Sequence, residues 1–179
     1  MMLGRFFRSF IKRKEGTTAI EFSLLAIPYL FVSLGIIELS IMYASASLLE
    51  GATGSAARQV RTGQLQQALG DPATNFRDSI CSYATILIDC NDVEIEVIPM
   101  DTYADFDSFA PVYDGDGNLV SQGFDAGGSD EIILIRTAYR YEMMTPVIGR
   151  LLAGADNSRL FMSTLVLQTE PYDFDGAGV

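Results

Sequence analysis

The chain has 179 residues, a net charge of −11, 49% hydrophobic residues and no histidine. This composition is typical of one folded domain with a short extra segment, and not of disordered or collagen-like chains. Without histidine, and with only two cysteines, the chain lacks the residues for a Ser-His-Asp triad, a Cys-His pair or an all-protein zinc site. We therefore expect no enzymatic activity, no catalytic residue and no cofactor. The acidic balance also argues against nucleic acid as a partner.

The N-terminal region carries the features of a membrane helix. Five basic residues precede residue 15, and an uncharged run follows from Phe22 to Ile37 and extends to about Ala44, interrupted by Glu38. A helix of about 20 mostly apolar residues spans a bilayer. The basic flank predicts a cytoplasmic N-terminus and an external remainder. The alternatives are a buried helix of a soluble protein and a cleaved secretory signal.

A glycine, a threonine and a glutamate stand at the head of this run, as Gly16, Thr17 and Glu21. Their spacing before an apolar helix resembles a type IV prepilin signal. With "SAARQVRTGQ", "IRTAYRYEMMTPVIG" and "QTEPY" further on, most of the chain resembles the TadE-like proteins of the tight-adherence (Tad or Flp) pilus. The resemblance implies that a prepilin peptidase cuts after Gly16. It also implies an inner-membrane minor pilin or pseudopilin that works with other Tad pilins and pilus assembly proteins.

Glu21 has a physical interpretation beside this resemblance. Thr17 and Glu21 are four residues apart and so share a helix face. After cleavage, the new α-ammonium group of Thr17 could pair with Glu21 of the same or a neighbouring subunit, which makes a buried charge tolerable. We also expect Glu21 in the first helical turn, where the helix dipole favours an anion. The alternative is a carboxylate that simply reaches the lipid headgroups.

The segment from Ser40 to Gln67 continues in helical style and is rich in small residues. Such residues allow helices to approach closely. The packing partner is either another helix of an assembly or the sheet of the protein's own domain. We place a basic leader at 1–16, the transmembrane part of the helix at 17–45 and a periplasmic or extracellular α+β domain at 46–179. The small residues proposed to mediate packing are Gly51, Ala52, Ser55 and Ala56.

A second helix is predicted from Asp71, a good N-cap, and Pro72, a good first residue. Its apolar stripe comprises Phe76, Ile80, Tyr83 and Leu87. Cys81 and Cys90 are the only cysteines, and outside the inner membrane such a pair usually forms a disulfide. A redox-active pair is the alternative, although the spacing is not Cys-x-x-Cys.

Three strands are predicted, at residues 92–100, 131–143 and 159–170. In the first, Val93, Ile95 and Val97 alternate with outward-facing Glu94 and Glu96. Arg136 and Arg140 of the second strand are placed to meet these glutamates across the sheet. Two helices followed by mainly antiparallel strands predict an α+β fold, with the long N-terminal helix continuing into a pilin-like domain.

An acidic segment connects the first two strands, and its sequence "DGDGN" begins like a calcium-binding loop. The match is weak, because Asp125 stands where such a loop needs a glutamate. A hairpin turn between "PVY" and "LVS" is the stronger interpretation. The weak calcium candidates are Asp114, Asp116 and Asn118. An alternative function is therefore a single-span envelope protein whose acidic external domain binds calcium or another surface ligand.

Overall fold

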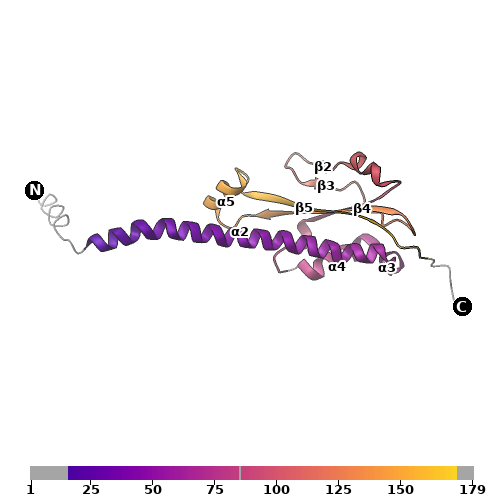
Figure 1. Cartoon of the computed structure of the whole chain (residues 1–179), viewed down its shortest axis with the longest axis horizontal. Helices are drawn as coiled ribbons and strands as arrows, with labels where there is room; N and C mark the ends of the chain where they lie inside the picture. Colours follow the sequence, from indigo (N-terminus) through magenta and orange to yellow (C-terminus); the bar gives the residue numbers. More distant parts are fainter. Residues whose placement is uncertain (1–15, 85, 173–179) are drawn as a thin grey trace, which may run out of the picture.

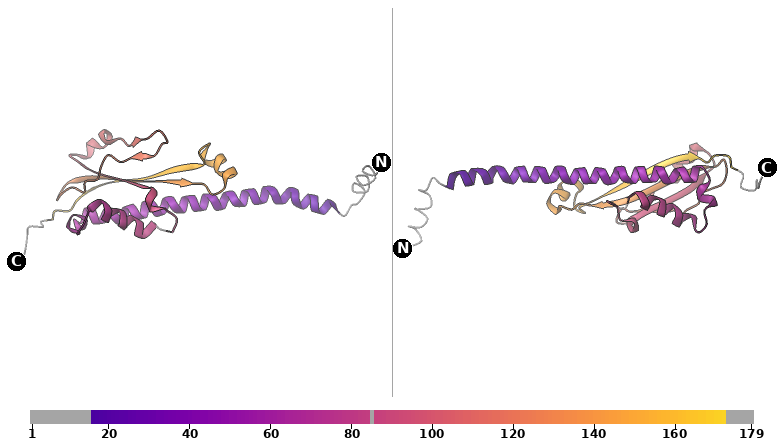
Figure 2. Two further views of the ribbon diagram at one scale, coloured as in Figure 1. Left: turned by 180° about the vertical axis from the view of Figure 1, so that it is seen from behind. Right: turned by 90° about the horizontal axis from the view of Figure 1, so that it is seen from below.

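The computed structural model describes residues 16–84 and 86–172. One long helix, α2 (Thr17–Arg61), projects from an α+β domain that packs against its C-terminal half (Figure 1). Both further views show the N-terminal end of α2 extending well beyond the domain, whose end near the middle of the helix is helix α5 (Pro146–Ala153) (Figure 2). The predicted α+β fold, with a long apolar helix leading into a small antiparallel sheet, is confirmed.

Helix α2 has 45 residues, which corresponds to a length of roughly 68 Å. It continues through Pro28 and ends where Gly63 adopts a left-handed conformation with φ 71°. Glycine takes up this conformation without steric cost, so it commonly ends helices. A single turn, α3 (Gln64–Gln67), follows. The predicted helical continuation beyond Ser40 is thus confirmed as far as Arg61, followed by a turn and α3.

Helix α4 (Pro72–Ala84) begins as predicted, since the Asp71 carboxylate accepts a hydrogen bond from the Thr74 backbone N–H at 2.9 Å. Its buried residues are Phe76, Ile80 and Ala84. The predicted stripe is wrong at Tyr83, which is 62% exposed. It is also wrong at Leu87, because the helix ends at Ala84.

The predicted disulfide between Cys81 and Cys90 is present. It joins α4 to the short 3-10 helix η2 (Cys90–Asp92), which leads directly into the first strand. On the chain-entropy model, a disulfide that closes a loop of this length stabilises the folded state by about 2.5–3 kcal/mol. The bridge therefore fixes the helix that covers the sheet to the start of that sheet.

The three predicted strands form one antiparallel sheet in the order β1-β4-β5, with β4 in the centre. The strands are β1 (Val93–Met100), β4 (Ile132–Glu142) and β5 (Ser158–Gln168). Between the last two lies helix α5 (Pro146–Ala153). In Figure 1, α2 and α4 lie on one side of the sheet. The core between these two layers includes Leu49, Val60, Phe76, Ile95 and Ile135.

The outer face of the sheet is covered by the acidic connection between β1 and β4. This connection contains a 3-10 helix, η3 (Tyr103–Phe109), and a hairpin of β2 (Val112–Tyr113) and β3 (Leu119–Val120). Figure 1 shows the hairpin on the side of the sheet opposite α2. The predicted hairpin turn is therefore confirmed.

Covering the outer face buries a charge that was expected to be exposed. Glu96 does face outward, but its exposed fraction is 0% because η3 and the hairpin segment lie over it. Its carboxylate is 2.8 Å from the Arg136 guanidinium, which is 2% exposed. Arg136 also donates to the Phe109 carbonyl, and the Gln122 backbone N–H donates to Glu96. The buried ion pair thus attaches the acidic connection to the sheet.

The predicted cross-strand contact of Arg140 is wrong. Its guanidinium donates to the Asn118 side chain, to the Asp116 carbonyl and to the Ser158 hydroxyl. No hydrogen bond or salt bridge joins Arg140 to Glu94 or Glu96 in the described part of the chain. Arg140 instead binds the hairpin turn, which folds back over this part of β4.

Candidate functional site: the projecting helix and its junction with the domain

The projecting half of α2 is apolar on all sides. An 18-residue window has a mean hydropathy of 2.1, and only 6% of it is buried in the protein. Nearly all its large apolar side chains are exposed, including Phe22 at 72% and Tyr29 at 71%. A core helix of a soluble protein would be mostly buried, so that alternative is not what the structure shows. By length and composition this is one helix able to cross a membrane, which fits a single-pass membrane protein.

The residues of the predicted cleavage motif lie at the free end of α2. Gly16 is exposed and immediately precedes the helix, of which Thr17 is the first residue. Glu21 is exposed but is the fifth helical residue, and the first turn contains no acidic residue. The expectation of a first-turn position, with its dipole stabilisation, is therefore wrong. Within residues 16–84 and 86–172 no group forms a hydrogen bond or ion pair with Glu21, so pairing with a cleaved N-terminus stays a prediction.

A second glutamate, Glu38, holds α2 to the domain where the projecting half begins. Its side chain is buried, with an exposed fraction of 2%. The carboxylate accepts hydrogen bonds from the Met144 backbone N–H at 2.8 Å and the Tyr141 hydroxyl at 3.2 Å. It also accepts them from the Thr145 backbone N–H at 3.1 Å and hydroxyl at 2.8 Å. Glu38 therefore binds the whole connection from β4 to α5.

Tyr141, which donates to Glu38, has a raised pKa. Burial raises the pKa of Tyr141 to about 12, and the negative charge of Glu38 acts in the same direction. The shift extends to higher pH the range in which Tyr141 keeps its proton and can donate to Glu38. Neither the charge pattern nor the helical period of the sequence identified this contact. Two features of the sequence could have indicated it, namely an acidic residue inside an apolar run and the polar "YRYEMMT" segment.

Helix α5 packs tightly between α2 and the end of the sheet. A Cβ atom on Gly35 would lie 3.9 Å from Cγ2 of Ile148. A Cβ atom on Gly149 would lie 2.5 Å from the Met143 Cβ, and still closer to Oδ1 of Asn157. Position 149 therefore has no room for a side chain, which explains the glycine in "TPVIG".

We expect Gly149→Ala to lower the free energy of unfolding by about 1–3 kcal/mol, because the added methyl group overpacks this site. Gly54→Ala is the matched control, since Gly54 is exposed on α2 and a Cβ there has no atom within 4 Å. The control should be neutral or stabilising by up to about 1 kcal/mol. Denaturant unfolding of both variants measures the difference. Equal stability of the two would contradict the tight packing at Gly149.

The small residues of α2 are divided between two faces. Ala52 and Ala56 are 1% and 0% exposed in the domain core, where the neighbouring Thr53 hydroxyl also bonds to that of Thr137. Gly51 is exposed, and a Cβ there would have no neighbour within 4 Å, while Ser55 is partly buried. Ala52 and Ala56 thus pack within the protein itself. Gly51 leaves an open face where another helix has space to approach.

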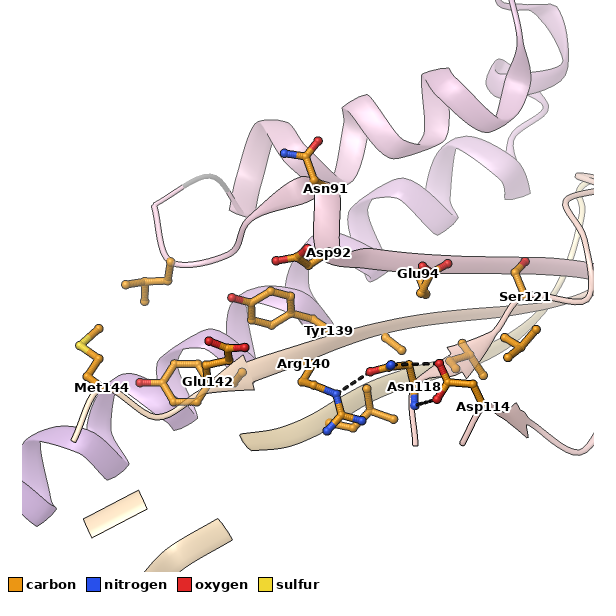
Figure 3. A pocket seen from close by; sticks show the side chains of 16 residues that line it. Asn91, Asp92, Glu94, Asp114, Asn118, Ser121, Tyr139, Arg140, Glu142 and Met144 are labelled. Carbon is orange, nitrogen blue, oxygen red and sulfur yellow. Dashed lines mark hydrogen bonds between the residues drawn. The ribbon is translucent and has the colours of Figure 1, made fainter. Parts of the chain in front are cut away.

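An open groove of about 700 Å³ lies beside β4 (Figure 3). Asp92, Glu94 and Glu142 give it an acidic lining, and Arg140 lines it next to Asn118. No group of three or more Asp, Glu, His or Cys residues is placed to hold a metal ion within the described ranges.

The weak calcium candidates lie in the turn of the hairpin. The Asp114 carboxylate accepts hydrogen bonds from the backbone N–H of Asn118, the Asn118 side-chain amide and the Asp116 N–H. These bonds lower the pKa of Asp114, and the bond from the Asn118 backbone has the largest effect. Its oxygen atoms are thus used to form the turn. Asp116 contributes its backbone carbonyl to Arg140.

A comparison of the sequence with known protein families finds a match that lies almost entirely within α2. Residues 16–58 match the family model described as "TadE-like protein". The matched residues include the exposed apolar half of α2, Glu38 and most of the helix that packs in the core. No curated protein matches the chain significantly, and no solved structure does.

Proposed function

We propose that this chain, which is TadE-like over residues 16–58, is a minor pilin or pseudopilin of a bacterial Tad/Flp pilus. The observation that carries the proposal is the continuous α2, whose exposed apolar half extends from a folded domain. Such a helix anchors the protein in the inner membrane and then packs among the helices of other pilins. The mechanism consists of insertion, packing and extraction, without enzymatic chemistry or a cofactor.

The junction at Glu38 suggests where the membrane span ends. The helix from Thr17 to Ile37 has 21 residues, or roughly 32 Å, which matches a hydrocarbon thickness of about 30 Å. Glu38 is the first residue of α2 whose side chain forms hydrogen bonds with the domain, which carries many charged groups. We therefore place the end of the span near Ile37, short of residue 45. The basic N-terminal flank then faces the cytoplasm and the domain faces the periplasm.

Processing by a prepilin peptidase fits the position of Gly16 at the exposed start of α2. Cleavage after Gly16 gives Thr17 a free α-ammonium group one helical turn from Glu21. Within lipid, this charge and the carboxylate stabilise each other, in the same subunit or between neighbouring subunits. Pairing with a neighbour would direct the new subunit into the assembly.

The test is the fate of the protein when pili are sheared from cells. We expect the wild-type chain in the sheared fraction, or in an assembly subcomplex isolated with it. Glu21→Ala should remove most of it, because the α-ammonium group then has no partner. Glu50→Ala is the control, since Glu50 is exposed on the same helix, and it should behave as wild type. A protein that stays wholly in the inner membrane, with Glu21→Ala unchanged, is instead a single-span envelope protein whose domain binds a ligand.

A further inference from the structure

The end of the domain that faces the projecting half of α2 exposes apolar side chains on segments other than α2. Val147 and Leu151 of α5 are 70% and 77% exposed, and Met144, just before α5, is 66% exposed. Ile86, after α4, is 85% exposed and lines a hollow with Met144 and Ile41 of α2. The exposed apolar surface of α2 is thus extended by apolar side chains at this end of the domain. We call Ile86, Met144, Val147 and Leu151 the apolar rim.

The position of α5 along α2 is fixed by contacts. Ile148 lies against Gly35, and Glu38 holds Met144 and Thr145 by their backbone N–H groups. Figures 1 and 2 show α5 beside the middle of α2, at the end of the domain nearest the projecting half. If the span runs from Thr17 to about Ile37, α5 lies at the depth of the lipid headgroups. This placement follows from helix length and does not depend on the composition of α5.

The same end of the domain carries two exposed arginines, Arg150 and Arg159. A guanidinium nitrogen of Arg159 donates to the Leu152 carbonyl at 3.1 Å, which holds this side chain at the end of α5. Neither arginine forms a salt bridge with another described residue. Exposed Asp156 in the connection from α5 to β5 and exposed Glu142 at the end of β4 lie at the same end of the domain, so this surface is mixed in charge.

We propose that the apolar rim is a second membrane contact, in which α5 lies in the outer leaflet interface of the inner membrane. The apolar rim enters the headgroup–acyl boundary, and Arg150 and Arg159 bind phosphate groups of anionic phospholipids. This inference rests on the proposed membrane span of α2. Because Glu38 joins α5 rigidly to α2, the contact fixes the rotation of the domain relative to the membrane until the subunit is extracted.

The absence of tryptophan from the chain allows single-tryptophan reporters of depth. Full-length Leu151→Trp protein is reconstituted into vesicles of phosphatidylglycerol and phosphatidylcholine with brominated acyl chains, which quench nearby indoles. Tyr29→Trp reports the span. Leu69→Trp is the matched control, because Leu69 follows α3, beyond the C-terminal end of α2, and is 97% exposed. Val147→Trp replaces Leu151→Trp if the latter does not fold.

We expect brominated lipid to reduce the emission of Leu151→Trp about twofold, as for a side chain about 5–10 Å inside the interface. Tyr29→Trp should be quenched more strongly, and Leu69→Trp not at all. Quenching of Tyr29→Trp without that of Leu151→Trp would overturn the rim contact alone. An unquenched Tyr29→Trp would overturn the membrane span, and with it the proposed function. Blue-shifted but unquenched emission of Leu151→Trp would mean that a second protein copy covers α5, which also overturns the rim contact.

A second arm tests the lipid class. In the Leu151→Trp background, the double change Arg150→Glu and Arg159→Glu should lower quenching in phosphatidylglycerol vesicles to the level found in pure phosphatidylcholine. Unchanged quenching in the charge-reversed protein would overturn the role of anionic phospholipid.

Discussion

Arg136→Met is expected to lower the free energy of unfolding by about 3–5 kcal/mol, because it leaves the buried Glu96 carboxylate without a counter-charge. The exposed fractions of Arg136 and Glu96 are 2% and 0%, so water cannot replace the lost guanidinium. The Phe109 carbonyl also loses its donor. We therefore expect the acidic connection to detach from the sheet before the rest of the domain unfolds.

The double variant Glu96→Leu with Arg136→Met distinguishes a loss of charge pairing from a loss of packing. Replacing both partners of a buried ion pair by apolar residues is often neutral or stabilising. It should therefore recover most of the stability. Arg140→Met is the matched single control, because Arg140 is partly exposed on the same strand. If Arg136→Met cost no more than Arg140→Met in denaturant unfolding, the buried ion pair would not have the role assigned to it.

Glu38→Ala is the second change with a large expected effect. Four donors from Tyr141, Met144 and Thr145 lose their acceptor. Hydrogen bonds to a charged group contribute about 1.5–3 kcal/mol each, with strong non-additivity. We expect a total loss of about 2–4 kcal/mol, because solvent can reach part of the vacated site.

Thermal unfolding of the full chain in detergent measures this effect. Tyr141→Phe removes only the hydroxyl and should cost about 1 kcal/mol. Glu50→Ala, at an exposed position of the same helix, should be close to neutral. A Glu38→Ala protein as stable as Glu50→Ala would show that Glu38 does not hold the junction. A destabilised variant should also lose protection from amide exchange first at residues 144–145, where the backbone donors lie.

Local patterns in the sequence predicted much of the fold. The N-cap at Asp71 and the alternation in β1 each depend on residues close in the chain, and the structure contains both. The hairpin turn is local as well, because Asp114 bonds to Asp116 and Asn118 only two and four positions away. These features need no knowledge of the tertiary arrangement.

The features that were missed depend on contacts between distant segments. Glu38 and Tyr141 are 103 positions apart, and no periodicity of α2 indicates which turn of the helix meets the β4–α5 connection. Glu96 is buried only because the connection after β1 folds back over the sheet, which strand alternation cannot reveal. The helical stripe failed at Leu87 because α4 ends at Ala84, and it failed at Tyr83 because Ala84, four residues after Ile80, occupies the buried face instead.

At the candidate site, the sequence identified the motif residues but not their surroundings. Gly16, Thr17 and Glu21 lie at the exposed end of α2, where lipid or another subunit would surround them. Under the proposed function, their partners are a cleaved N-terminus or a neighbouring subunit, which single-chain sequence patterns do not describe. The junction at Glu38, in contrast, is formed within the chain. It fixes the position of the domain along the helix.

The mass and N-terminal sequence of the mature protein, isolated from membranes or pili of cells with and without the prepilin peptidase, test the pilin-type function most directly. A chain beginning at Thr17 in cells with the peptidase, and retaining residues 1–16 in cells without it, is the predicted result. A chain that retains residues 1–16 in both would contradict processing after Gly16. Thr17 would then have no free α-ammonium group for Glu21 to pair with.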